Sequence, residues 1–301
     1  MEEIIPLMSE DVDIGLILKK AFHKVFHDMG YIAIYLIPFI GGLFTLLFIQ
    51  FSGVNLFSRS PTMPGFQSPS QMPSISMTEL GILLIALGTY ILIISILTMI
   101  AMIAVTIKAD KEEDGLYVTA SDALGMSFGY ILSVIGAAII VGLATIGPFL
   151  LGAILVYMAI TVTTYNYSLG LLLAATSIFV MIILLIPAIY IGLRLSLYLQ
   201  ACVIDNLNAI ESVKKCWHVT RGHVLLLFIT LLILYVITIP FTLLNMALPQ
   251  FQIGTLLSML IVGPISAVTL TLIYRGLTGK TEAKPSKPDN APIEVGQHNS
   301  F

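Results

Sequence analysis

Long uncharged apolar blocks between residues 31 and 277 constrain this chain more than any other feature of its sequence. The 301 residues are 57% hydrophobic and only 10% charged, whereas soluble domains carry roughly 25% charged residues. A water-soluble protein must still present a polar surface, so a large core alone does not explain this deficit. The composition predicts an integral membrane protein. The net charge of −3 gives no reason to expect a nucleic-acid partner.

A helix that spans a membrane needs about 20 apolar residues. The apolar blocks lack the polar–apolar alternation of barrel strands, so helices are expected. The predicted fold class is therefore an all-α polytopic membrane protein with six transmembrane helices. The six spans are expected at 31–51, 80–107, 130–160, 168–200, 223–247 and 254–275.

Two of these blocks are longer than a bilayer requires and contain helix-breaking residues, Gly147-Pro148 in one and Pro187 in the other. Each block could form one kinked helix or two short ones. A turn between two spans at Gly147-Pro148 would move the basic residues of 201–222 to the outer side. The charge distribution therefore favours a single helix in each block.

The basic residues predict the orientation of the chain. With both termini in the cytosol, 13 of the 14 Lys and Arg residues lie inside or at the inner interface, and Arg59 is the exception. This distribution follows the positive-inside rule and predicts a multi-pass protein of the cytoplasmic (cell) membrane. The expected regions are a cytosolic N-terminus (1–30), a membrane domain (31–277) and a disordered cytosolic tail (278–301).

A short amphipathic helix on the cytosolic side is expected before each of three pairs of spans. The first and third, near 14–27 and 209–218, have clear apolar and basic faces, and Ser121 or Asp122 is expected to cap a weaker middle one. The first span of each pair also contains a Pro-Phe pair, at residues 38, 148 and 240. Internal duplication and chance both account for this pattern. Such helices can bind anionic lipid, but we favour a connecting role.

A family resemblance rests on the segment RLSLYLQACVIDNLNAIESVKKCWHVTRGHV at 194–224. It resembles part of the membrane domain of glycerophosphoryl diester phosphodiesterases and of related prokaryotic multi-pass proteins of unknown function. Those proteins show an arginine at the end of a span, an acidic residue, and then a helix of the A-L-x-x-S-W-x-L-T-x-G type. The corresponding residues are Arg194, Asp205, Ile210, Val213, Cys216, Trp217, Val219, Thr220 and Gly222.

Two positions depart from that pattern, because Cys216 stands where serine is usual and Val213 where leucine is common. In the fused enzymes of this family, catalysis belongs to a separate soluble barrel domain with a metal site. Only a short tail follows residue 277 here. The resemblance therefore implies a stand-alone membrane domain without phosphodiesterase activity.

Arg194 is the most informative charged residue, because it lies near the inner end of a long apolar block, where a buried cation needs a partner. It could pair with Asp205 or Asp122, extend to the lipid headgroups, or bind a lipid phosphate. The sequence thus indicates a lipid-headgroup or interhelical charge site. Its candidate residues are Arg194, Asp205, Lys214, Lys215 and Arg221.

Other polar residues give weaker indications. His23 and His27 have the i, i+4 spacing that can place two imidazoles on one metal ion, but a solvated helix face is expected, with no metal or cofactor. Cys202 and Cys216 are expected to be buried small hydrophobes, and Trp217 an anchor at the inner interface.

The blocks 80–107 and 130–193 contain no charged residue, whereas ion-coupled carriers and intramembrane enzymes use ionisable side chains within their spans. We therefore expect a non-enzymatic, lipid-facing structural or accessory component. Its partners would be membrane lipids and an unidentified membrane protein. The alternative is a small-solute or lipid transporter whose path follows Gly147-Pro148 and Pro187.

A third interpretation is an enzyme at the inner interface. It would use Arg194, Asp205 and either His218 or His223, and it requires these side chains to meet in one cleft.

Overall fold

The computed structural model describes residues 13–51, 77–247 and 252–280, and every regular element in these ranges is an α-helix. The predicted all-α fold class is confirmed. The prediction for the tail 278–301 falls largely outside the described residues. In chain order the helices are α1 (Ile14–His27), α2 (Gly30–Phe51), α3 (Met77–Glu113), α4 (Ala120–Ser127), α5 (Ile131–Thr163), α6 (Tyr167–Leu195), α7 (Tyr198–Ile204), α8 (Ala209–Val219), α9 (Val224–Ala247) and α10 (Ile253–Leu277).

Five segments of the described chain are long and apolar enough to cross a membrane. They are most of α3, α6 together with α7, and the helices α5, α9 and α10. A sixth is obtained if α1 and α2, which meet at an angle of 78°, are counted together. The prediction of several apolar helices able to span a membrane is thus confirmed, with five to six such segments in the described chain.

The two blocks that contain proline breaks each form one continuous helix. Pro148 lies inside α5 and Pro187 lies inside α6. The 33 residues of α5 correspond to roughly 50 Å, which exceeds the hydrocarbon thickness of about 30 Å. The expectation of single helices, drawn from the charge distribution, agrees with this arrangement.

The helices α5 and α6 form a long hairpin. The Asn166 side chain accepts a hydrogen bond from the Leu169 N–H at 3.2 Å and so caps the start of α6. Gly170 allows the two helices to approach closely, because a Cβ atom at this position would lie 2.5 Å from the Thr163 Cα. The chain therefore turns tightly at the far end of the hairpin.

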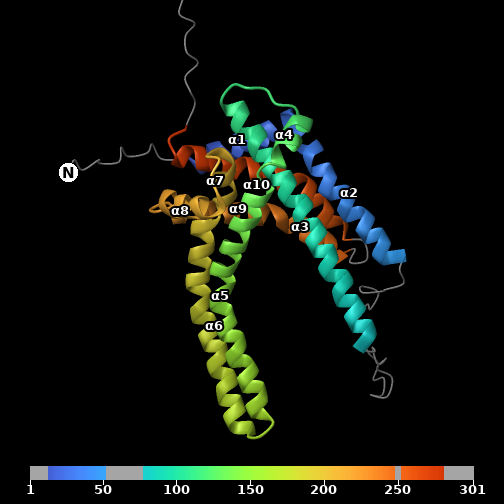
Figure 1. Ribbon diagram of the computed structural model, residues 1–301, viewed down its shortest axis with the longest axis vertical. Coiled ribbons are helices and arrows are strands. Elements are labelled where there is room, and N and C mark those ends of the chain that lie inside the picture. The colour runs from blue at the N-terminus through green and yellow to red at the C-terminus, as the bar shows by residue number, and fades with distance from the viewer. Residues whose placement is uncertain (1–12, 52–76, 248–251, 281–301) are drawn as a thin grey trace, which may run out of the picture.

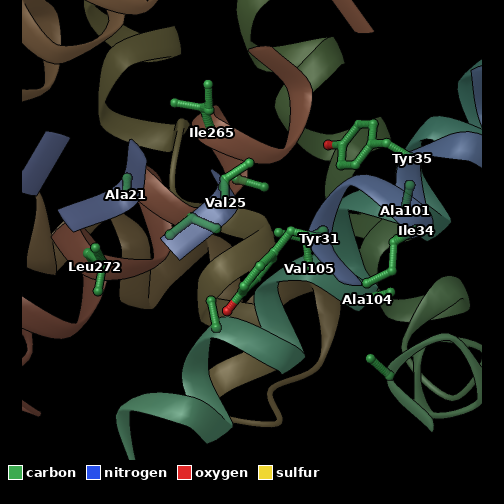
Figure 2. Packing of buried hydrophobic residues seen from close by; sticks show 14 of the residues in the cluster. Ala21, Val25, Tyr31, Ile34, Tyr35, Ala101, Ala104, Val105, Ile265 and Leu272 are labelled. Carbon is green, nitrogen blue, oxygen red and sulfur yellow. The ribbon is translucent and has the colours of Figure 1, made fainter. Parts of the chain in front are cut away.

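The main buried cluster joins α1, α2, α3, α4 and α10 (Figure 2). Tyr31 and Tyr35 of α2 are almost fully buried, together with Val25 of α1 and Ile265 of α10. Gly263 lets the Tyr35 ring lie directly on α10, because an added Cβ would be 2.3 Å from its Cε1 atom. The apolar face of α1 is therefore packed into the protein core.

The α5–α6 hairpin projects away from α2 and α3 (Figure 1). Its two helices pack mainly against each other, and the ends next to α7 and α8 hold them to the rest of the chain. In the most apolar stretch of each segment, only 6% of α5 and 11% of α6–α7 is buried inside the protein. The corresponding share for α10 is 61%. The hairpin consequently presents apolar side chains in nearly every direction.

The order of the helices follows the threefold pattern expected from the sequence. A short helix precedes two long ones in α1–α2–α3, α4–α5–α6 and α8–α9–α10, and α7 has no counterpart. The first long helix of each set contains one of Pro38, Pro148 and Pro240. The predicted cap of the middle short helix was wrong, since α4 is capped by Thr119, whose hydroxyl accepts from the Asp122 N–H at 3.2 Å.

Candidate functional site

Charged side chains gather where α1, the C-terminal end of α3 and the end of α10 meet. Lys108 of α3 is 1% exposed, and its Nζ lies 2.7 Å from Asp28 Oδ2 and 2.8 Å from Glu112 Oε1. It also donates to the Val118 carbonyl at 2.8 Å, and the Tyr31 hydroxyl donates to Glu112 at 2.6 Å. A buried ammonium is tolerated when its donors are satisfied in this way.

Two further ion-pair groups extend this layer. Lys20 and Lys24 of α1 lie 2.7 Å and 2.5 Å from the Glu113 carboxylate of α3. Arg275 of α10 reaches back to α3, where its two terminal nitrogens contact Asp110 at 2.5 Å and Asp114 at 2.7 Å. The ends of α1, α3 and α10 are therefore held together by paired charges.

An open depression of about 480 Å³ lies beside Arg275. Asp110, Asp114, Lys111 and Lys280 contribute to its walls. Its acidic groups, Asp110 and Asp114, are already paired with Arg275. The depression is therefore lined by charged side chains whose charges largely cancel.

Asp205, one of the predicted site residues, follows α7 and bonds to the end of α10. The Tyr274 hydroxyl donates to one carboxylate oxygen at 2.5 Å, and Lys280 lies 2.6 Å from the other. Partial burial alone would raise the pKa of Asp205, but the hydrogen bonds from Lys280 and Tyr274 lower it to a net value below the ordinary 3.8. Asp205 therefore anchors the C-terminal end of α10.

Arg194 is buried at the end of α6, with 6% of its surface exposed. Its guanidinium lies 3.9 Å from the centroid of the Trp217 ring, and Nη2 donates to the Trp217 carbonyl at 2.6 Å. The Tyr190 hydroxyl accepts a longer bond of 3.4 Å, and Nε is buried without a partner among the described residues. Arg194 thus links α6 to α8 through an aromatic ring and a carbonyl.

The backbone of Arg194 strengthens this link. Its carbonyl accepts hydrogen bonds from the Cys216 thiol and the Thr220 hydroxyl, both at 3.0 Å. The pairing with Asp205 or Asp122, one of the three alternatives for Arg194, is not formed: Asp205 pairs with Lys280, and Asp122 accepts from Thr119. The reason is topological, because Asp205 faces α10 whereas Arg194 faces α8.

The remaining predicted site residues lie on or just after α8. Lys214, Lys215 and Arg221 are exposed, and none forms an ion pair with a carboxylate of the described ranges. Trp217, on the same helix, is 37% exposed. The structure therefore brings Arg194 together with α8 and leaves Asp205 in a separate set of contacts.

The histidines and cysteines remain apart from this site. The rings of His23 and His27 are exposed and stack 5.4 Å apart on α1. Within the described ranges, no group of three or more His, Cys, Asp or Glu residues could hold a metal ion. Cys202 and Cys216 are both free and buried, as expected from the sequence.

The buried network around Lys108 was not predicted from the sequence. A signal was available, because Lys108 and Glu112 are four residues apart at the end of an apolar helix, a spacing that places them on one face. No protein-family model, curated protein or solved structure matches this chain.

Proposed function

We propose that this chain is a non-enzymatic, multi-pass protein of the cytoplasmic membrane that acts as a lipid-facing structural or accessory component. The main support is the α5–α6 hairpin, whose apolar side chains are exposed over almost its whole length. An apolar surface of this extent is stable only against lipid or an apolar partner. The hairpin would therefore stand in the bilayer and meet acyl chains and neighbouring membrane proteins.

The proposed topology has six spans and both termini in the cytosol. Lys24, Lys108, Arg194 and Arg275 lie near the ends of their helices, at the end where α1, α4, α7 and α8 gather (Figure 1). Clustering of basic residues at one end supports an orientation with that end inside. In this topology α1 and α2 count as an interfacial helix followed by a span.

The ionisable groups of the charged end support a structural role. Lys108, Glu113, Asp205 and Arg275 are each engaged in ion pairs or hydrogen bonds that join different helices. Side chains committed in this way hold helices together. An enzyme at the inner interface would require Arg194 and Asp205 to meet in one cleft. This alternative is not supported, because Asp205 contacts Tyr274 whereas Arg194 contacts Trp217.

We further propose that the segment resembling the phosphodiesterase membrane domains is a structural unit of its own. The residues that carry the resemblance contact one another, since Arg194 bonds to Trp217, Cys216 and Thr220. This supports a role for the pattern in docking α8 onto α6.

The transport alternative would require the proline break of α5 to line a path. A Cβ atom added at Gly142 or Gly147 would meet no other atom within 4 Å. At these two positions the surface of α5 therefore faces away from the other described helices, which favours contact with lipid.

A spin label at Ile182 of α6, which is 58% exposed, tests the proposal in reconstituted bilayers. A lipid-facing hairpin predicts frequent collisions of the label with molecular oxygen and rare collisions with a water-soluble nickel chelate. A label at the exposed Ser121 provides the aqueous control. Accessibility of the Ile182 label to the nickel chelate at the level of Ser121 would indicate a water-filled path and contradict the proposal.

A further inference from the structure

Three buried or half-buried cations of this chain differ in pairing from the exposed cations around α8. Around α1, α3 and α10, the cations Lys24, Lys108 and Arg275 each lie within 2.8 Å of a carboxylate. Their charge is neutralised by the protein itself. These residues therefore leave little positive potential for an external ligand.

The cations around α8 form no such close ion pair with the described carboxylates, although the charge of Lys215 acts on Asp205 over a longer distance. Lys214, Lys215 and Arg221 are exposed and form no ion pair with the described carboxylates, and the buried Arg194 is held by the ring and the carbonyl of Trp217. The acidic residue within α8 is Glu211, in its first turn. Positive charge therefore exceeds negative charge on this surface.

Aromatic side chains lie among these cations. Trp217 and Tyr190 are 37% and 46% exposed, and their rings meet edge to face at 6.4 Å. Ile210 of α8 is also exposed. Amphipathic rings of this kind prefer the boundary between headgroups and acyl chains, so the surface combines the two properties that suit a lipid interface.

A depression next to α8 offers room for a headgroup. Its volume is about 530 Å³, and Ser133, Asn208, Glu211 and Lys214 contribute to its walls. The Asn208 side chain makes no capping bond to the first turn of α8. The depression adds hydrogen-bonding groups beside Lys214. The positive charge that would attract an anionic headgroup comes from the basic residues themselves.

We propose that this α8 surface, formed by Arg194, Lys214, Lys215, Trp217 and Arg221, binds the headgroups of anionic phospholipids in the adjacent leaflet. Arg194 fixes α8 against α6, and the exposed cations attract the phosphates. The inference rests on the proposed membrane role and adds the ligand class. Each basic residue near an anionic membrane surface strengthens binding roughly five-fold.

Trp217 is the sole tryptophan of the chain, so its fluorescence reports on this surface directly. The full-length protein in a mild nonionic detergent would be titrated with phosphatidylglycerol and, separately, with phosphatidylcholine. We expect a saturable change of Trp217 emission with the anionic lipid alone, weakened by added salt because exposed charges are screened.

Two matched double variants test the assignment. K214Q/K215Q removes two unpaired cations of the α8 surface, and K19Q/K111Q removes two cations that also lack an ion pair with described carboxylates but lie elsewhere. We expect roughly 25-fold weaker binding of phosphatidylglycerol by the first variant and unchanged binding by the second. Far-UV circular dichroism would verify that both variants are folded.

Three outcomes would overturn the proposal. They are an equal response of the wild-type protein to both lipids, an equal loss of affinity in both double variants, and an equal response to inorganic phosphate alone. The last outcome would assign the surface to a soluble anion. The spin label at Ile182 measures the contact of the α5–α6 hairpin with lipid, and it does not depend on the α8 surface. A negative result of the phosphatidylglycerol titration can therefore be distinguished from a failure of the proposed membrane role.

Discussion

The guanidinium of Arg194 lies 3.9 Å from the centre of the Trp217 ring and donates to the carbonyl of the same residue at 2.6 Å. One side chain thus contacts both the ring and the backbone of a residue 23 positions later. The carbonyl belongs to the last turn of α8, where the negative end of the helix dipole attracts a cation. This contact fixes α8 at the end of α6.

Arg194→Ala is expected to destabilise the protein by about 2 to 4 kcal/mol, through loss of a buried cation–π contact and a charged hydrogen bond. Thermal unfolding followed by Trp217 fluorescence measures the effect, and emission at longer wavelength is expected in the folded variant. Arg194→Lys should restore little, because an ammonium lacks the planar group that stacks on the ring. An alanine variant with wild-type emission and melting temperature would contradict this role.

Lys108→Met is expected to destabilise the fold by roughly 3 kcal/mol, because it leaves Asp28 and Glu112 without their shared partner. The double variant K108M/E112Q should be more stable than K108M alone, since it removes a carboxylate that has lost its nearest cation. Thermal unfolding of the three proteins in the same detergent provides the comparison. Equal melting temperatures of K108M and the double variant would exclude the proposed coupling.

Acid is expected to weaken the attachment of α10 to Asp205. The pKa of Asp205 in the folded protein lies below its ordinary value of 3.8, so its ionised form stabilises the fold above that pH. The contribution disappears as the pH falls through the lowered value. Melting temperatures between pH 5 and pH 3 should fall less steeply for Asp205→Asn than for the wild type, and parallel curves would show that Asp205 has no part in the acid sensitivity.

Gly263→Ala is expected to destabilise the core by about 1 to 3 kcal/mol, because the new methyl group would overlap the Tyr35 ring. Gly142→Ala is the matched control, since this helical position faces open space and alanine favours the helix by up to about 1 kcal/mol. The two variants should therefore shift the melting temperature in opposite directions. A neutral Gly263→Ala would mean that Tyr35 does not rest on α10.

Much of the fold was predictable because the apolar blocks are long. Hydrophobic length and the absence of charge indicate spanning helices directly, and the helices α2, α3, α5, α6, α9 and α10 cover the six expected blocks. The packing between them was not predictable from these blocks. Their sequences are apolar on all sides, so they carry no periodic signal for the buried face.

The candidate site was predicted in part. Arg194 stood out as a cation at the end of an apolar block, but its contacts with the Trp217 ring, the Trp217 carbonyl and the Tyr190 hydroxyl were not foreseen, because these groups can hold a guanidinium without a carboxylate. The ion pairs of Lys108 with Asp28 and of Arg275 with Asp110 join residues that are distant in sequence. Only the three-dimensional meeting of α1, α3 and α10 reveals them.

The most direct test of the central claim is the sidedness of two engineered cysteines in intact cells. Burial raises the pKa of the native Cys216 thiol to about 12, so this residue and the buried Cys202 react slowly with maleimides. With both termini in the cytosol, Tyr165→Cys, at the exposed tip of the α5–α6 hairpin, is expected to react with a membrane-impermeant maleimide added outside. Ser121→Cys should react only after the membrane is opened. The reverse pattern, or equal labelling of both from outside, would contradict the proposed topology and with it the cytosolic position of α8.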